Sequence, residues 1–261
     1  MQLTREVRFS LTAAEPEPAI TNSWGGWPSG GGLAPYVVVR VTVAGAVDPR
    51  TGYLCNITEI DRVVRARVIP AVRSRWESAG GDVPCAALLP EMAEALAAGL
   101  PAGIALVAVT LQSTPYLWFV LDLEEPSMVR MTQSFEFAAA HRLFCADLSA
   151  EENQRVFGKC TNPNGHGHNY MVEVTVAGEP DARCGVVIEM GRLEQTVKAR
   201  VIDVFDHKHL NEDCAEFAAL NPSVENITRV IWSKLEGQFA PAKLACVRVY
   251  ETPKTYAEVC E

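Results

Sequence analysis

The sequence predicts an α+β fold built from two tandem units, each an antiparallel sheet with two helices on one face in the order ββααββ. Three observations lead to this prediction: an internal repeat, stretches in which apolar and polar residues alternate, and stretches with apolar residues at helical spacing. The segment VTVAG at 41–45 recurs at 174–178, and ARVI at 66–69 recurs at 199–202, both with a shift of 133 positions. Two identities at one offset indicate a duplicated domain.

The predicted units are residues 1–126 and 127–261. A strand-like stretch at 116–123 gives way to acidic residues and a proline at 124–127, which is typical of a boundary. The 261-residue chain is long enough for either one large domain or two ordinary ones.

The second unit is predicted to contain two long strands, a hairpin, two helices and two further strands. Alternation predicts strands, and a turn-forming segment at 179–185 predicts a return strand after the second of them. The expected strands are 131–139, 169–178, 186–189, 244–251 and 255–260.

The two helices of this unit follow from apolar residues on one helical face. Ser223 is the expected N-cap of the second helix, and Gly237 ends its pattern. The apolar positions are Leu193, Val197, Val201 and Val204 or Phe205 in the first helix, and Val224, Ile227, Val230, Ile231 and Leu235 in the second.

The first unit has a similar pattern with two differences in its helices. Pro70 is expected to interrupt the first helix, because proline lacks the N–H that a helix interior needs. An alanine-rich stretch at 87–100 is expected to replace the second helix.

Composition excludes several classes of protein. The formal net charge is −9, and no run of lysine or arginine forms a phosphate-binding stripe, so nucleic acid is not an expected partner. Residues 1–10 resemble neither a signal peptide nor a membrane-spanning helix, which favours a soluble, cytoplasmic protein with no membrane partner. The 8 cysteines are scattered, which favours reduced thiols over disulfides.

The histidines point to a metal site in the second unit, because all 5 lie between His141 and His209. His166 and His168 are two residues apart at the start of a predicted strand, so their side chains leave the same face. His141 ends the neighbouring strand. Three imidazoles would leave one coordination position open for water or substrate, as catalytic zinc requires.

The same residues are compatible with two simpler interpretations. The histidines could be unrelated polar residues near a turn, or Cys160 could be a fourth protein ligand in a structural zinc site. Imidazole also suits several divalent ions, so the pattern does not identify the metal.

The segment KCTNPNGHGHNY at 159–170, preceded by FEFAAAHR at 135–142, resembles the 6-pyruvoyl-tetrahydropterin and 6-carboxy-tetrahydropterin synthases, which have the tunnelling fold. The resemblance covers about residues 131–261. Supporting segments are DHKHLN at 206–211, SVEN at 223–226 and VYET at 249–252.

The resemblance implies a role for each residue of the candidate site. His141, His166 and His168 are expected to bind Zn²⁺, and Cys160 to act as the catalytic base, with its pKa lowered by the nearby cation. Asp206 and His207 are expected to work with the cysteine, the carboxylate fixing the imidazole tautomer. Glu251 is expected to anchor the pterin ring, and the remaining expected substrate-binding residues are Ser223 and Glu225.

The implied reaction is a lyase step on 7,8-dihydroneopterin triphosphate, in which zinc stabilises the developing enolate and triphosphate leaves. The five-residue gap between Cys160 and His166 favours the pyruvoyl-forming enzyme over the carboxy-forming one, which usually has three and releases acetaldehyde. Arg142, Lys159 and Lys208 are candidates for the triphosphate by proximity only. A zinc-stabilised scaffold or a metal-independent thiol hydrolase would also be compatible with these residues.

The first unit lacks the corresponding residues. At the 133-residue shift, Trp27, Leu33, Pro35, Arg73 and Ser74 occupy the positions of Cys160, His166, His168, Asp206 and His207. A separate match, of VRFSL at 7–11 with QSFEF at 133–137, makes Glu15 the counterpart of His141. This unit is expected to be structural, or to line a neighbouring site with Trp24, Trp27 and glycines 30–32. Family members assemble into barrels with sites between subunits, so a homo-oligomer is expected.

Overall fold

The computed structural model describes residues 1–12 and 24–261, which divide into two compact units. Unit 1 is Met1–Met131 with Gly178–Val187, and unit 2 is Thr132–Ala177 with Ile188–Glu261. Both units combine helices with antiparallel strands, so the predicted α+β class is confirmed. No described helix has the length and hydrophobicity needed to cross a membrane. Glu15 lies outside the described residues.

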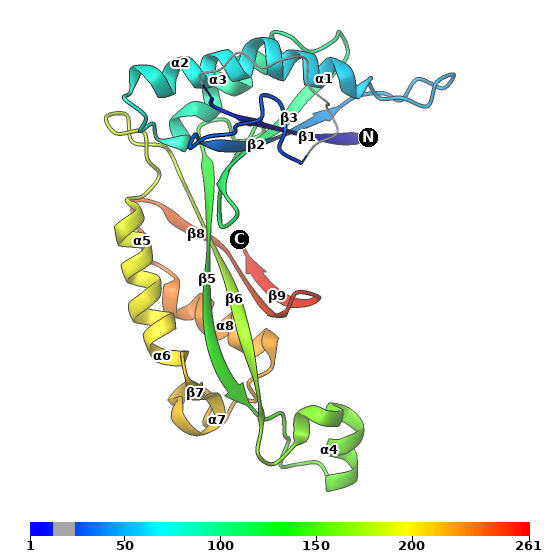
Figure 1. The fold of residues 1–261 in the computed structure, drawn as a ribbon. Coiled ribbons are helices and arrows are strands. Elements are labelled where there is room, and N and C mark those ends of the chain that lie inside the picture. Colours follow the sequence, from blue (N-terminus) through cyan, green and yellow to red (C-terminus); the bar gives the residue numbers. More distant parts are fainter. Residues whose placement is uncertain (13–23) are drawn as a thin grey trace. The chain divides into compact units, whose positions relative to one another are not determined.

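The described residues of unit 1 form four consecutive antiparallel strands and three α-helices. Figure 1 shows these helices along one face of β1–β3. The alternating burial of β2, whose Val37, Val39, Val41 and Val43 are buried, supplies the apolar face that these helices cover. The bounds are β1 Gln2–Ser10, β2 Tyr36–Ala44, α1 Ile57–Val63, α2 Ile69–Ser78, α3 Cys85–Ala97, β3 Ala105–Thr114 and β4 Leu117–Asp122.

The first helical segment of unit 1 continues through Pro70, so the predicted interruption is wrong. A π-helical turn, Val64–Val68, joins α1 to α2, and Pro70 lies in the first turn of α2. The wider hydrogen-bonding pattern of a π turn departs from the i→i−4 ladder, so the missing N–H of proline is tolerated there.

Unit 2 has the sheet order β5-β6-β8-β9, with the short β7 paired in parallel with β5. Leu193, Val197, Val201 and Phe205 are fully buried, which confirms the apolar face of the first predicted helix. The bounds are β5 Val129–His141, α4 Ala150–Phe157, β6 His166–Gly178, α5 Met190–Val197, α6 Asp203–Phe205, β7 Lys208–His209, α7 Leu210–Asp213, α8 Val224–Leu235, β8 Lys243–Thr252 and β9 Thr255–Cys260.

Two segments of the predicted second unit, residues 127–261, differ from the prediction. The loop between the first two strands contains α4, whose N-terminus is closed by a capping box between Ser149 and Glu152. Residues 186–189 form no strand. Val187 and Ile188 are buried without joining the sheet, so the apolar pattern reflects burial rather than strand pairing.

The repeated sequence segments have matching backbone irregularities in the two units. The β2–β3 pairing shifts register between Thr42 and Val43, and the β6–β8 pairing shifts between Thr175 and Val176, at the same 133-residue offset. Each ARVI segment also contributes to a π-helical turn within the first long helical segment of its unit. The repeated residues therefore share local geometry as well as identity.

One cysteine pair contradicts the prediction of reduced thiols. Cys246 and Cys260 lie opposite each other on β8 and β9 and form a disulfide. The 14-residue separation carries no pairing signal in the sequence, because the antiparallel register alone brings the two thiols together. The other six cysteines are free.

Candidate metal centre and active site

The three predicted metal ligands come together at one end of the unit 2 sheet. His141 is the last residue of β5, and His166 is the first residue of β6. His168 follows two positions later, on the same face of β6 as His166. One donor atom from each histidine and one from Glu251 all lie within 4.8 Å of one another.

The spacing of these donor atoms suits a tetrahedral metal site. The Nε2 atoms of His141 and His166 are 3.1 Å apart, and Glu251 Oε1 lies 3.3 Å from His141 Nε2 and 3.5 Å from His168 Nε2. Two ligands at zinc–nitrogen distances of about 2.0–2.1 Å in a tetrahedron are about 3.3 Å from each other. The cluster therefore fits one divalent ion without a large rearrangement.

His141 is held in the tautomer that a metal ligand needs. Its side chain is fully buried, and its Nδ1 lies 2.7 Å from the carbonyl oxygen of Pro222. A carbonyl only accepts, so Nδ1 carries the proton and Nε2 presents its lone pair to the cluster. Burial lowers the pKa of His141 to about 4, with the neighbouring histidines adding to the effect, so the ring is neutral at pH 7.

This depressed pKa predicts a pH dependence for the metal-free protein. The unfolded chain takes up the His141 proton near the ordinary pKa of 6.5, whereas the folded chain resists until about pH 4. The free energy of unfolding should therefore fall by about 3 kcal/mol from this group as the pH drops from 6.5 to 4. When the free energy of unfolding is measured with urea at several pH values in this range, it should change less with pH in His141→Gln than in the unmodified chain.

The other two histidines carry buried nitrogens without hydrogen-bond partners. Among the described residues, His166 Nδ1 and His168 Nε2 are buried and have no acceptor or donor. Burial, followed by the adjacent His168, lowers the pKa of His166, so this ring also favours its neutral form. Of the two atoms, His168 Nε2 lies in the cluster, 3.5 Å from Glu251 Oε1, and a buried polar atom without a hydrogen-bond partner calls for a ligand that the chain itself does not supply. A divalent cation fits this cluster.

Glu251 occupies a position that the sequence did not indicate. It was expected to anchor a substrate ring, yet its carboxylate oxygen lies among the histidine nitrogens. Its place on β8 follows from the antiparallel pairing of β6 with β8, in which Met171 lies opposite Tyr250. The fourth group in the cluster is thus Glu251, whereas Cys160 is not part of it.

Cys160 lies in a short 3-10 turn, Gly158–Thr161, before β6. Backbone contacts fix this turn to the end of β5: the Leu143 N–H donates to Cys160 O, and Arg142 Nε donates to Thr161 O. In the metal-free protein, burial raises the pKa of the Cys160 thiol, and the negative charge of Glu251 raises it further. The thiol therefore needs nearby positive charge to act as a base at neutral pH.

Asp206 and His207 form the expected pair. The carboxylate accepts from His207 Nδ1 at 2.8 Å and from the Ala138 N–H at 2.9 Å, and these two bonds hold the pKa of Asp206 below its usual range. His207 has a φ of 56°, a left-handed conformation that non-glycine residues adopt uncommonly. Its side chain is 83% exposed, so the ring is available to groups outside unit 2.

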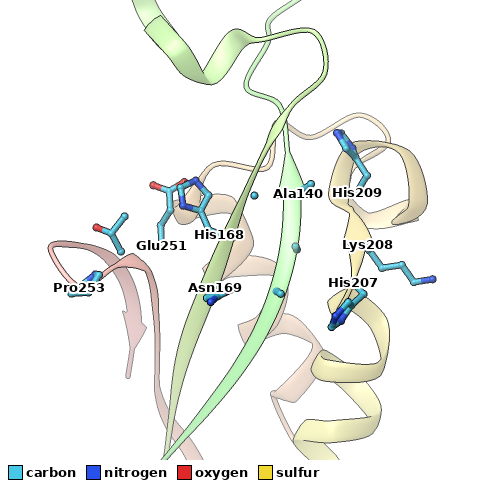
Figure 2. Close-up of a pocket in the computed structure, with 12 residues that line it drawn as sticks. Ala140, His168, Asn169, His207, Lys208, His209, Glu251 and Pro253 are labelled. Carbon is cyan, nitrogen blue, oxygen red and sulfur yellow. The ribbon is translucent and has the colours of Figure 1, made fainter.

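A pocket of about 760 Å³ contains part of this site. Figure 2 shows His168 and Glu251 on one side of the two long strands, and His207, Lys208 and His209 on the other side. Cys160 does not line the pocket. The structure thus brings the three predicted metal ligands together, but within one unit His207 does not lie on the same side of the two strands as the cluster.

Ser223 and Glu225 lie at the start of α8, just after the carbonyl that holds His141. Ser223 is the N-cap, as predicted, and its hydroxyl accepts from the Asn226 N–H. A hydrogen bond from Ser223 lowers the pKa of Glu225, so this carboxyl is charged at pH 7. Neither residue lines the pocket.

Two features of the site were not identified from the sequence. His209 lines the pocket, and its Nδ1 is buried without a partner among the described residues. The Pro222 carbonyl orients His141 from 81 positions away. The clustering of all five histidines was a usable signal for His209, but no sequence pattern marks a backbone carbonyl.

The fold and the cluster define an α+β protein with a three-histidine and one-carboxylate group suited to a divalent cation. A family model described as 6-pyruvoyl tetrahydropterin synthase matches residues 130–261. The chain belongs to this family, which confirms the resemblance inferred from the sequence and the prediction of a lyase of this type.

Individual relatives match the same half of the chain. The 6-pyruvoyl tetrahydrobiopterin synthase of Homo sapiens is 42% identical over 123 residues, covering 47% of this chain and 85% of the relative. That of Drosophila melanogaster is 41% identical over 125 residues, covering 48% and 74%. The 6-carboxy-5,6,7,8-tetrahydropterin synthase of Rickettsia conorii is 26% identical over 150 residues, covering 51% and 100%.

A solved structure also matches. The 6-pyruvoyl tetrahydropterin synthase of Caenorhabditis elegans is 36% identical and has a TM-score of 0.49, covering 51% of this chain and 96% of the other.

Proposed function

We propose that unit 2 catalyses the zinc-dependent conversion of 7,8-dihydroneopterin triphosphate to 6-pyruvoyl-tetrahydropterin, with release of triphosphate. The single observation that carries this proposal is the convergence of His141, His166 and His168, within a sequence that belongs to the 6-pyruvoyl tetrahydropterin synthase family. The 42% identity to the human synthase favours the pyruvoyl product over the carboxy product, for which the relative is 26% identical.

Three histidines would hold the metal, with Glu251 beside them. A zinc ion bound there would supply a Lewis acid for the side-chain oxygens of the substrate and a positive charge that lowers the pKa of Cys160. Imidazole ligands also accept other divalent ions, so metal analysis of the purified protein is part of the test.

The remaining steps of the proposed reaction are carried out by side chains of the protein. Cys160 removes a carbon-bound proton from the substrate side chain, and departure of triphosphate completes the elimination. Asp206 keeps the His207 imidazole oriented, so that His207 can pass protons to and from the thiol. Arg142, Lys159 and Lys208 are the three candidates for binding the triphosphate. Of these, only Lys208 lines the pocket, which favours it for this role.

The placement of His207 supports an active site completed by a second copy of the chain. Its exposed ring lies across the long strands from His168 and Glu251 (Figure 2), so His207 of one copy would meet Cys160 of another. We propose a homo-oligomer on this basis, in which each chain supplies two tandem units to a barrel. The matching bulges and π turns of the two units support their origin by duplication.

Glu251 is proposed to bind substrate rather than to remain a permanent metal ligand, because a site closed by four protein groups has no open position for chemistry. Glu251→Gln should therefore raise KM by at least about tenfold, the cost expected for a lost charged hydrogen bond, with metal content unchanged. Steady-state kinetics and metal analysis of the same preparation measure both quantities. A loss of metal with unchanged KM would instead assign the carboxylate to the metal.

Product identification tests the proposed reaction directly. Purified zinc-loaded protein incubated with 7,8-dihydroneopterin triphosphate should release triphosphate and form a product with the mass of 6-pyruvoyl-tetrahydropterin, without acetaldehyde. Acetaldehyde with the carboxy product would identify the carboxy-forming reaction, and an unchanged substrate would contradict both. Heat-inactivated protein is the control, because the substrate can degrade unaided.

A further inference from the structure

Unit 1 contains a pocket that the function of unit 2 does not use. It has a volume of about 590 Å³ and lies between β1, the loop at 24–28 and the first helical segment. Its lining carries three arginines, one carboxylate and one indole. The lining residues are Arg5, Trp27, Thr58, Asp61, Arg62, Arg65 and Ala66.

Among the residues that the structure describes, one of the three arginines has no counter-ion. Arg5 is paired with Asp61 through two hydrogen bonds of 2.7 and 2.8 Å, and Arg62 is paired with Glu59. Arg65 makes no ion pair with any described residue, and its Nε is buried without an acceptor. A buried N–H of a cation without an acceptor is uncommon, because its lost hydration is not replaced. The Arg65 Nε–H is therefore a donor for which the described residues supply no acceptor.

Trp27 gives the pocket a flat apolar wall. The Arg65 guanidinium lies 5.0 Å from the centre of the Trp27 ring. The loop that carries this indole is fixed to β1, since the Trp27 N–H donates to Arg8 O and the Ser10 N–H donates to Pro28 O. Gly26 allows this close approach, because a Cβ there would lie 2.2 Å from Arg8 O at a φ of +71°. The indole is thus held in place before any ligand arrives.

We infer that this pocket binds a small organic anion that joins a flat ring to a phosphate or carboxylate group. The anionic group accepts from Arg65 Nε, with Arg62 and the Thr58 hydroxyl at the same wall, and the ring lies against Trp27. The sequence comparison between the two units supports a separate role for this pocket. At the 133-residue shift, Trp27 occupies the position of Cys160, so this loop of unit 1 has an aromatic side chain where unit 2 has a thiol.

Calorimetric titration of the metal-free full-length chain tests this inference, because the removal of metal eliminates coordination of the probe in unit 2. The probes are 1-naphthyl phosphate, 1-naphthoate, inorganic phosphate and uncharged 1-naphthol. One of the two ring-bearing anions should bind at one site per chain, at least about tenfold more tightly than inorganic phosphate or 1-naphthol. Whichever of the two binds more tightly identifies the anionic group.

Variants of the pocket give the matched comparison. Arg65→Gln should weaken binding of the preferred anion by at least about tenfold, as expected for loss of a charged hydrogen bond. Arg65→Lys should also weaken it, because lysine keeps the charge but lacks the planar Nε donor. Arg67→Gln removes the same charge from an exposed position outside the pocket and should change binding less than about twofold.

Two outcomes would overturn the inference. Equal weakening by Arg65→Gln and Arg67→Gln would show that binding depends on overall charge alone. Equal affinity for inorganic phosphate and the naphthyl anions, unchanged in Trp27→Leu, would show that the indole wall contributes nothing. Circular dichroism of each variant confirms that the fold is retained, and neither outcome depends on whether unit 2 is a lyase.

Discussion

Replacing Cys160 with alanine should leave the metal bound and lower kcat by about 10²- to 10⁴-fold, the usual contribution of a positioned base. Cys160 lies outside the donor cluster formed by the three histidines and Glu251, so its removal takes no ligand from the metal. Metal content and turnover of the same preparation measure the two effects separately.

The control for this variant is Cys145→Ala, which removes a half-buried free thiol on the same long connection between β5 and β6. It should keep both the metal and the turnover. If Cys160→Ala loses metal or stability while Cys145→Ala does not, unit 2 is a zinc-stabilised scaffold with Cys160 as a ligand. If turnover survives complete removal of metal, the chain is a thiol hydrolase instead.

The same variant examines the proposed site between copies. Cys160→Ala and His207→Gln should each have a strongly lowered turnover alone. After the two are unfolded together and refolded as mixed oligomers, a fraction of the sites would combine an intact Cys160 from one copy with an intact His207 from another. Recovered turnover in the mixture supports a site shared between two copies. If the mixture recovers no turnover, both residues belong to the same copy at each site.

Replacing His166 or His168 with alanine should abolish turnover and lower metal affinity by well over about a hundredfold, because even outer partners of a metal site contribute 10- to 100-fold. The remaining groups lack the third imidazole, because each substitution removes one of the three histidines of the cluster. Competition with a chromophoric chelator measures the affinity of each variant.

His207→Gln and His209→Asn are the matched controls, since both remove an imidazole from the pocket without touching the cluster. Both should retain metal within about tenfold of the unmodified chain, a smaller effect than loss of a ligand. Retention of full metal affinity in His166→Ala and His168→Ala would contradict the proposed centre.

Local sequence determined much of the fold and most of the candidate site. Apolar residues at helical spacing located the helical segment that begins with α5 and the helix α8, and Ser223 marked the start of α8, because capping depends on neighbouring residues. His166 and His168 share a face of β6 because side chains alternate along any strand. The repeat identified the shared strand and helix segments of the two units, since equal residues at equal spacing favour equal local geometry.

Tertiary structure alone decided the features that depend on residues distant in the sequence. Strand register placed Glu251 among the histidines and joined Cys246 to Cys260, and a register is set by the packing of the whole sheet. The Pro222 carbonyl fixes His141 across 81 positions. The strand registers depend on how separate segments pack. The contact to His141 is made by a backbone carbonyl, a group that nearly every residue carries, so no sequence pattern identifies it.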